Sequence, residues 1–372
     1  MYKIVADENM PALSLFARSA EIVTVAGRNV DTAQLQGADT LLVRSITQVN
    51  KALLEGTQIR FVGSATIGTD HVDLAWLKQQ GIAFAHAPGC NAQAVAEYVL
   101  QAVVVWLLEQ HKSPQDAVIA VVGHGNVGAK VAELCEALGM QVKLVDPLHQ
   151  RQGHAYALLG DVLQADIISC HVPLTHDGED ATFHLFNHKR LKQLHSKQLL
   201  INTSRGAVVD NQSLKELLQE GDGPTAWLDV WEGEPSIDAE LLAWVRMGTP
   251  HIAGYTVEGK WRGTWMLYQA WQQFYQFNGN EQQMPQLAPK RVWRADVVTL
   301  EDIKQLLQAY YPMVKDFERL QKSLSAHNSA QAFDDLRRDY GQRFELAGVV
   351  CEGKVAPQWR PLFSLLGIVC AG

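Results

Sequence analysis

Residues 117–128, Ala-Val-Ile-Ala-Val-Val-Gly-His-Gly-Asn-Val-Gly, decide the fold that we predict for this chain. An apolar run of strand length ends here in the pattern Gly-x-Gly-x-x-Gly, and residues 129–139 continue with helical spacing. A second apolar run, residues 141–145, follows and stops at Asp146. The order strand, glycine turn, helix, strand and acidic residue predicts a Rossmann-type unit that binds a dinucleotide.

Each glycine of this turn has its own role in the prediction. Gly123 permits the tight turn, Gly125 lets the backbone approach a pyrophosphate, and Gly128 lets the helix pack closely on the strand. The amides and partial positive charge of the helix N-terminus suit that pyrophosphate. Asp146 would accept hydrogen bonds from the adenine-ribose hydroxyls and repel a 2′-phosphate, so we expect NAD rather than NADP. The cofactor-binding residues expected in this motif are Gly123, Gly125, Asn126, Val127, Gly128 and Asp146.

The bulk composition limits the class of protein. A length of 372 residues predicts two or three domains, and 47% apolar with 19% charged residues is typical of a soluble globular protein. The net charge of -8, without a basic block, makes nucleic acid an unexpected partner. The five cysteines form no C-x-x-C pair, which argues against a disulfide framework or a zinc site and suits a reducing compartment. We therefore expect no metal.

Neither the N-terminus nor the most apolar stretch predicts a membrane protein. Residues 1–7 enter a strand-like run directly and lack the regions of a signal peptide. Residues 95–108 contain Glu97 and Gln101 and are too few to span a bilayer, so they predict a buried helix. We expect a cytoplasmic protein without a membrane partner.

The first 90 residues alternate strand-like and helix-like segments, which predicts a βα domain with a parallel sheet. The expected strands are 3–7, 21–25, 40–43, 60–62 and 82–85, and the expected helices are 13–17, 53–55 and 74–80. Two strand ends, residues 43–47 and 62–70, are polar and lie where parallel sheets bind ligands. The residues alone also fit two ordinary turns with helix-capping hydroxyls.

A long apolar helix over 91–110 leads into further βα units, whose strand ends carry polar groups aimed at one edge of the sheet. These segments are 166–175, 199–206, 225–230 and 245–255. Helix continues through 265–275, and a proline-containing linker at 284–289 predicts a domain boundary. The remainder is mostly amphipathic helix, as in 300–311 and 330–340. The apolar run 361–370 is expected either to fold into the core or to be buried against another subunit.

Three side chains at these strand ends form a candidate catalytic set: Arg205, Glu234 and His251. A guanidinium can bind a carboxylate at two points, and a histidine can take or give a proton near neutral pH. A carboxylate beside the histidine would hold its ring in place. Together these groups suit hydride transfer between a 2-hydroxy acid and nicotinamide. Each also has an ordinary structural reading, since most histidines are structural and Arg-Gly and Glu-Pro are common in turns.

Four segments resemble the D-isomer-specific 2-hydroxyacid dehydrogenases: 123–128, 202–206, 233–235 and 249–254. They occur in the family's order and at similar spacing, and the resemblance covers residues 1 to about 280. Residues 251–260 and 262–264, with the short C-terminal region, resemble one branch of that family. The resemblance implies that this protein would oxidise 4-phospho-D-erythronate to (R)-3-hydroxy-2-oxo-4-phosphooxybutanoate in pyridoxal 5′-phosphate (vitamin B6) biosynthesis.

The resemblance implies a role for each matching residue. Arg205 would bind the substrate carboxylate and the C2 oxygen, His251 would remove the hydroxyl proton, and Glu234 would pair with His251. Asp229 would face the nicotinamide carboxamide. The other implied cofactor contacts are Thr175, Thr203, Ser204 and Gly254, and the implied substrate contacts are Ser45, Thr66 and Tyr255.

The resemblance also implies an α/β fold of two Rossmann-like, doubly wound parallel-sheet domains with a small C-terminal α+β dimerisation domain. A substrate-binding domain would span 1–92, completed by 256–283, an NAD-binding domain 93–255, and the dimerisation domain of a homodimer 286–372. D-3-phosphoglycerate dehydrogenase, or another D-2-hydroxyacid dehydrogenase, is the nearest alternative, although longer forms of the former end in a regulatory βαββαβ domain that 286–372 does not resemble. An NAD-sensing, corepressor-like binding protein on the same fold is the alternative of another class.

Overall fold

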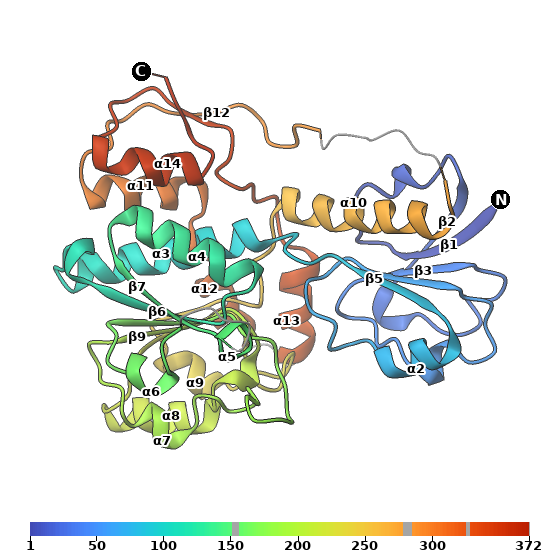
Figure 1. Cartoon of the computed structure of the whole chain (residues 1–372), viewed down its shortest axis with the longest axis horizontal. Coiled ribbons are helices and arrows are strands. Elements are labelled where there is room, and N and C mark those ends of the chain that lie inside the picture. The colour runs from blue at the N-terminus through green and yellow to red at the C-terminus, as the bar shows by residue number, and fades with distance from the viewer. Residues whose placement is uncertain (151–155, 278–284, 325–327, 372) are drawn as a thin grey trace. The chain divides into compact units, whose positions relative to one another are not determined.

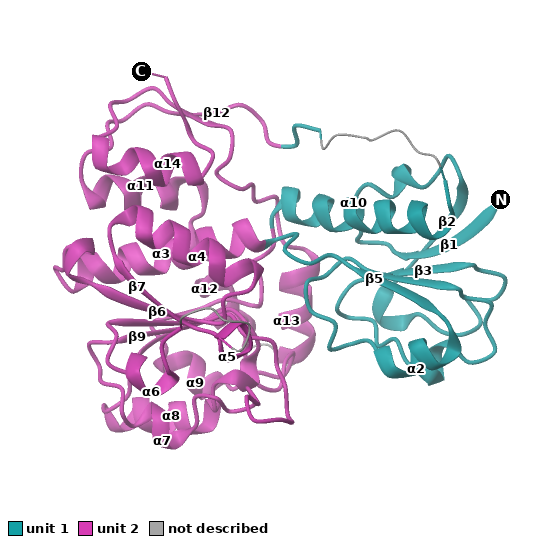
Figure 2. Cartoon of the chain, viewed as in Figure 1, with its two compact units in different colours: residues 1–91, 256–287 teal, residues 92–255, 288–372 magenta. Residues whose placement is uncertain are grey.

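The computed structural model describes residues 1–150, 156–277, 285–324 and 328–371. The chain forms two compact units, each built from two separate stretches of sequence (Figure 2). Unit 1 comprises residues 1–91 and 256–287, and unit 2 comprises residues 92–255 and 288–372. Met284, where the predicted linker begins, and residues 278–283 of the segment expected to complete the first domain lie outside the described residues.

Unit 1 contains a five-stranded parallel sheet in the order β2-β1-β3-β4-β5. Neighbouring residues of a strand point to opposite faces, so Ile4 and Val5 enter different cores. The five strands are β1 (Tyr2–Asp7), β2 (Ala20–Val25), β3 (Thr40–Val43), β4 (Phe61–Ser64) and β5 (Ala83–His86). All five agree with the expected strands to within two residues, whereas the expected helix 13–17 is only a short 3-10 turn, Leu13–Leu15.

Helices cover both faces of this sheet (Figure 1). On one face, α10 (Val257–Phe274) packs Leu267 and Trp271 against the strands. On the other face lie α1 (Lys51–Leu54) and α2 (Leu74–Gln80), which contributes Leu77 to the core. Unit 1 is therefore a three-layer α/β structure that needs residues from after position 256 to complete one layer.

Unit 2 contains a six-stranded parallel sheet in the order β11-β10-β9-β8-β6-β7. Its strands are β6 (Val118–Val122), β7 (Gln141–Val145), β8 (Ile167–Cys170), β9 (Leu199–Asn202), β10 (Thr225–Leu228) and β11 (Met247–Gly248). Strand β6 pairs with β7 on one side and with β8 on the other, so the winding direction reverses between β6 and β8. In doubly wound sheets the ligand crevice lies beyond the carboxyl ends of the strands at this reversal. The predicted Rossmann-like, doubly wound fold is confirmed.

Two helical layers cover this sheet (Figure 1). One layer contains α3 (Ala92–Glu109) and α4 (Asn126–Leu138), which pack on each other and form one hydrophobic core with the sheet. The opposite layer contains α8 (Asn211–Glu220) and α9 (Ala239–Trp244) and belongs to a second core. Shorter helices, α5 (Pro147–Gln150), α6 (Leu159–Val162) and α7 (His188–Leu191), lie in the connections.

The expectation that this stretch is too short to span a bilayer is wrong, because helix α3 extends past 95–108 on both sides and, at 18 residues, is long and apolar enough to cross a membrane. The structure buries 72% of it inside the protein, however, which is typical of the core helix of a globular unit. Its burial agrees with the expected buried helix.

The C-terminal region, residues 288–371, packs on both layers of unit 2. Helix α11 (Leu300–Tyr310) contacts α3, and α14 (Arg360–Leu365) contacts α4. Helix α12 (Met313–Leu324) contacts α9 and β11, and α13 (Ser329–Arg338) packs on α12. A small parallel sheet joins β12 (Arg291–Trp293), β13 (Val349–Cys351) and β14 (Val369–Cys370).

The apolar end of the chain is part of a core. Leu362, Phe363 and Leu366 are each at most 1% exposed and belong to the core that contains α3 and α4. Of the two expectations for this run, folding into the core is confirmed for these side chains. Leu365 and Val369 remain exposed.

Candidate functional site

The glycine turn after β6 leaves the start of α4 open. Gly123 has a φ of +94°, and a Cβ there would lie 2.8 Å from the backbone of His171. A Cβ on Gly128 would lie 1.8 Å from the Gly123 carbonyl oxygen, which explains the close approach of helix and turn. Gly125, by contrast, is exposed and faces open space, and no side chain caps α4 there. The first amides of α4 are thus available to an anion, as a dinucleotide pyrophosphate requires.

Asp146 follows β7 and lies against the same turn. Its carboxylate accepts hydrogen bonds from the backbone N–H of His124 at 2.8 Å and of His149 at 3.2 Å. The His149 side chain also lies beside it, with Nδ1 2.9 Å from Oδ2. Burial would raise the pKa of Asp146, but these hydrogen bonds and His149 lower it below its ordinary value. The residues present therefore fit NAD: open helix amides for the phosphates and an ionised carboxylate where the sequence leads us to expect the ribose.

The side chain of Asn202 stabilises the turn after β9, which carries Arg205. The Asn202 side chain donates to the Arg205 carbonyl at 2.8 Å and accepts from the Ser204 hydroxyl at 2.8 Å. A Cβ on Gly206 would lie 1.9 Å from the backbone of Trp231, so only glycine lets the two turns meet. The turn that carries Arg205 therefore contacts the loop that carries Glu234.

Asp229, at the end of β10, shapes the loop that carries His251. The side chain is 1% exposed, and it accepts hydrogen bonds from the Thr249 hydroxyl and from the N–H groups of Ile252 and Ala253. Burial raises the pKa of Asp229 even though these donors and His251 lower it. The structure thus gives Asp229 a positioning role that the sequence did not suggest.

Glu234 and His251 form a pair. The Nδ1 atom of His251 lies 2.8 Å from Oε2 of Glu234, while Oε1 of Glu234 accepts the Trp231 N–H at 2.8 Å. His251 has a φ of 56°, a left-handed conformation that is uncommon for a residue with a side chain. Burial would raise the pKa of Glu234, but His251 and the other neighbours lower it, so the carboxylate is ionised at neutral pH. The structure therefore brings together two of the three predicted catalytic residues in direct contact.

The other predicted cofactor contacts lie at the carboxyl edge of the same sheet. Thr175 is exposed, and its N–H donates to the Thr182 hydroxyl at 2.8 Å. The Thr203 hydroxyl lies 3.3 Å from Nδ1 of His171, a residue that sequence reasoning did not select. Burial lowers the pKa of His171 to about 3, so this ring is neutral. Its place directly after β8, beside the reversal of the sheet, is the signal that could have identified it.

Two predicted substrate residues belong to unit 1. Ser45 is exposed in the turn after β3. The Thr66 hydroxyl donates to the Gly68 carbonyl at 2.7 Å and lies 2.7 Å from the Ser64 hydroxyl, which in turn lies 2.8 Å from Nε2 of His71. The hydroxyl of Thr66 therefore stabilises the turn after β4 in which Thr66 lies.

Tyr255, the third predicted substrate residue, belongs to unit 2 and contacts the C-terminal region. Its ring packs edge-on against Tyr340 with the centroids 6.1 Å apart, and Cζ of Arg337 lies 5.8 Å from its ring centroid. Neither Arg337 nor Tyr340 was selected from the sequence, because no motif links them to the catalytic segments. Their positions follow only from the packing of α12 and α13.

His184, Asp210 and Glu232 form a group of possible metal ligands next to this site, since Glu232 comes two residues before Glu234 in the same loop. Glu232 binds His184 at 2.8 Å and accepts the Asn211 N–H, while Asp210 caps α8. These contacts explain the cluster without an ion.

Comparison with known proteins agrees with this geometry. Residues 99–253 match the family model described as the D-isomer specific 2-hydroxyacid dehydrogenase, NAD binding domain. The chain is 43% identical to the erythronate-4-phosphate dehydrogenase of Tolumonas auensis, over 93% of this chain and 94% of that protein. It is also 43% identical to the enzymes of the same name from Shigella flexneri and Marinobacter nauticus, over 93–94% of each chain.

Solved structures share the fold at lower identity. The D-lactate dehydrogenase of Aquifex aeolicus, complexed with NAD and lactic acid, is 24% identical with a TM-score of 0.61, and the match covers 74% of this chain and 95% of that one. The NAD⁺-bound 3-phosphoglycerate dehydrogenase of Entamoeba histolytica is 21% identical with a TM-score of 0.63, covering 77% and 99%. The match to the curated enzymes, in contrast, extends over almost the whole chain. The chain therefore belongs to the D-isomer-specific 2-hydroxyacid dehydrogenases, in the branch of the erythronate-4-phosphate dehydrogenases.

Proposed function

We propose that this protein catalyses the NAD-dependent oxidation of 4-phospho-D-erythronate to (R)-3-hydroxy-2-oxo-4-phosphooxybutanoate, a step of pyridoxal 5′-phosphate biosynthesis. The observation that carries the proposal is the contact of 2.8 Å between Glu234 and His251, next to the turn that carries Arg205. The identity of 43% to named erythronate-4-phosphate dehydrogenases over almost the whole chain supports the choice of substrate. The same identity argues against the two alternative functions, that of a D-3-phosphoglycerate dehydrogenase and that of a corepressor-like binding protein.

The Glu234–His251 pair determines which nitrogen acts on the substrate. An ionised carboxylate can only accept a hydrogen bond, so His251 must carry a proton on Nδ1 when it binds Glu234. Nε2 is then the basic nitrogen, and it takes the proton of the substrate C2 hydroxyl. The anchored carboxylate also stabilises the imidazolium that this transfer creates. The left-handed backbone of His251 and the hydrogen bonds of Asp229 hold the ring in this orientation.

Arg205 supplies the charge that positions the substrate. Its guanidinium can bind the substrate carboxylate at two points and stabilise negative charge on the C2 oxygen as the proton leaves. The hydrogen bonds of Asn202 and the close packing of Gly206 fix the backbone that carries it. NAD, when bound by the α4 amides and Asp146, supplies the acceptor for the C2 hydride. Thr175, Thr203, Ser204, Asp229 and Gly254 are the further cofactor contacts that we propose, with Asn126 and Val127 at the start of α4.

We also propose that the protein is a cytoplasmic homodimer whose subunits meet through the C-terminal region. Exposed apolar side chains support this surface: Val298 is 48% exposed, Leu365 41% and Val369 55%. Two-fold dimers are the commonest symmetric assemblies.

Steady-state kinetics of the purified protein test the proposed activity. Wild-type protein should reduce NAD with 4-phospho-D-erythronate, and His251→Asn should lower kcat by about 100-fold or more, the usual scale for loss of a general base. NAD binding should be unchanged, since His251 is not among the cofactor contacts. His195 is exposed and distant in sequence, so His195→Asn is the matched control and should retain full activity. Near-normal turnover of His251→Asn at every pH would reject the assignment of the base.

A further inference from the structure

A basic side chain from the C-terminal region lies at the loop of residues 249–255, which carries His251 and Tyr255 and is called the catalytic loop below. Arg337 is in the last turn of α13, and its guanidinium carbon lies 5.8 Å from the ring centroid of Tyr255. Tyr255 comes four residues after His251, in the loop that Asp229 holds. The ring of Tyr340 also packs against the ring of Tyr255, at an interplanar angle of 74°. Two residues of the C-terminal region therefore fix the position of this phenol.

The surroundings of Arg337 favour its positive charge. Burial would lower the pKa of Arg337, but Tyr255 and Glu234 raise it above the ordinary value. Its Nε atom is buried and has no hydrogen-bond partner among the described residues. Oε2 of Glu234 pairs with His251 and Oε1 accepts the Trp231 N–H, and neither oxygen forms a hydrogen bond with Nε of Arg337. A buried guanidinium donor without a partner is costly, and an anionic ligand would satisfy it.

The adjacent residue, Arg338, has different surroundings from those of Arg337. Arg338 is exposed and forms ion pairs with Asp335 at 2.7 Å and with Asp339 at 2.8 Å. Its donors are engaged on the surface of α13. Arg337 instead turns toward the catalytic loop, although the two residues are adjacent in the chain.

The substrate of the proposed function carries two anionic ends, a carboxylate and a phosphate. Arg205 is assigned to the carboxylate, and the net charge of -8 gives a dianionic phosphate no general attraction. A phosphate therefore needs local cationic donors, and a guanidinium binds its oxygens with charge-assisted hydrogen bonds. We propose that Arg337, together with the phenol of Tyr255, binds the phosphate group of the substrate, so that the C-terminal region contributes to substrate specificity. This inference rests on the proposed function.

The test compares phosphorylated and unphosphorylated substrates. Arg337→Gln should raise KM for 4-phospho-D-erythronate so that kcat/KM falls by about 100-fold, on the scale of two lost charge-assisted hydrogen bonds. The rate with D-erythronate, which lacks the phosphate, should change less than about threefold. Arg337→Lys keeps the charge but loses the fork of donors and should recover part of the loss. Arg338→Gln is the matched control and should behave as wild type.

Two further measurements separate the possible failures. Calorimetric titration with 4-phospho-D-erythronate should show the same loss of affinity in Arg337→Gln without requiring turnover, and thermal unfolding should show that the variant is folded. Equal losses on both substrates, or an unchanged KM for the phosphorylated one, would overturn the phosphate assignment. Absence of NAD reduction by the wild-type protein with 4-phospho-D-erythronate would instead reject the proposed function itself.

Discussion

At the scale of single residues, we propose that Asp146 links backbone geometry to cofactor choice. The amide groups of His124 and His149 donate to its carboxylate and keep its pKa below the ordinary value despite burial. The side chain is therefore ionised at neutral pH, at the end of the strand that follows the glycine helix. A second negative charge placed there, such as the 2′-phosphate of NADP, would be repelled.

Replacing Asp146 with serine should weaken NAD binding and relatively favour NADP. We expect KM for NAD to rise by about tenfold or more, because a charge-assisted hydrogen bond to the ribose is lost. Steady-state kinetics with both cofactors measure the ratio of their kcat/KM values. Asp161 is an exposed aspartate of the same unit, and Asp161→Ser is the control that should leave the ratio unchanged. A ratio that stays at the wild-type value in Asp146→Ser would contradict this role.

At the scale of elements, apolar runs and glycine turns were sufficient to predict the strands of both large sheets. They failed for the small sheet, because β12, β13 and β14 have only two or three residues each and show no periodicity. The same limit applies to the site. Motif spacing predicts Gly123, Asp146 and His251, which lie at strand ends, whereas Arg337 reaches the catalytic loop only through the packing of α13 on α12. Contacts of that kind depend on tertiary structure and leave no local pattern.

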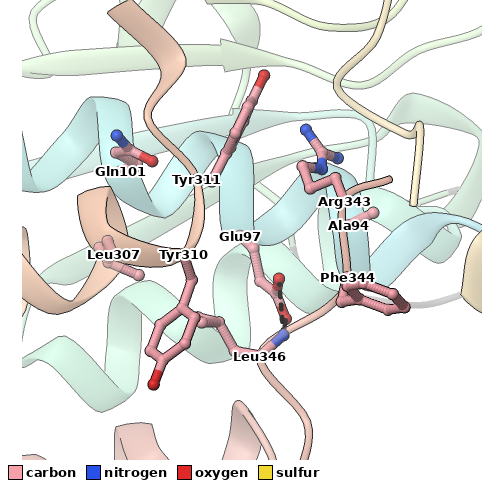
Figure 3. Close-up of a pocket in the computed structure, with 9 residues that line it drawn as sticks. All are labelled: Ala94, Glu97, Gln101, Leu307, Tyr310, Tyr311, Arg343, Phe344 and Leu346. Carbon is pink, nitrogen blue, oxygen red and sulfur yellow. Dashed lines mark hydrogen bonds between the residues drawn. The ribbon is translucent and has the colours of Figure 1, made fainter. Parts of the chain in front are cut away.

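Helix α3 provides a second contact between distant elements, at Glu97. Its carboxylate accepts the Leu346 N–H at 3.0 Å and lies beside a cavity of about 10 Å³ that Arg343 also lines (Figure 3). The side-chain amide of Gln93 also donates to it, at 3.1 Å. Burial and the nearby Glu345 raise the pKa of Glu97 from 4.5 to about 8, although Gln93, Leu346 and Arg343 oppose the rise. The guanidinium of Arg343 also contacts the catalytic loop, where it donates a hydrogen bond to the Ala253 carbonyl.

The raised pKa of Glu97 predicts how stability depends on pH. Between pH 4.5 and about 8 the folded protein keeps a proton that the unfolded chain loses, so the free energy of unfolding should fall as pH rises through this range. Glu97→Gln keeps an acceptor for Leu346 and removes the titration, so its stability should decline less over the same range. Urea unfolding at intervals from pH 5 to 8 measures both slopes. The exposed Glu133 supplies the control, since Glu133→Gln should retain the wild-type slope. Parallel curves for wild type and Glu97→Gln would show that Glu97 does not titrate in this range.

At the scale of the whole molecule, residues 288–371 are part of the folding unit that contains the glycine turn. Ile303 and Phe363 belong to the core under α3 and α4, while Leu320 and Phe333 belong to the core on the opposite face of the sheet. Removing this region would expose apolar surface on both layers.

A chain that ends at residue 287 should therefore fail to fold into a stable unit 2, and we expect it to be insoluble or to lack a cooperative thermal transition. Circular dichroism and ultracentrifugation measure the outcome. Leu365→Ser changes only an exposed side chain of α14, so this variant should keep the fold while weakening the proposed dimer. Light scattering of the full-length protein tests the assembly directly. A folded, NAD-binding fragment would show that the C-terminal region is dispensable for unit 2. A full-length protein that is monomeric at micromolar concentration would contradict the proposed dimer.

The interleaving of the two units in the sequence has a consequence for biosynthesis. Unit 1 opens with residues 1–91 but requires α10, and unit 2 opens at residue 92 but requires the region after 288. During translation, the first sheet must therefore wait, with one face uncovered, until the ribosome has completed most of unit 2. The core of the second sheet is complete only after Leu366 and Ile368 have been synthesised. We therefore expect nascent chains of this protein to expose apolar surface until these segments are made, and to bind chaperones that recognise such surface at the ribosome.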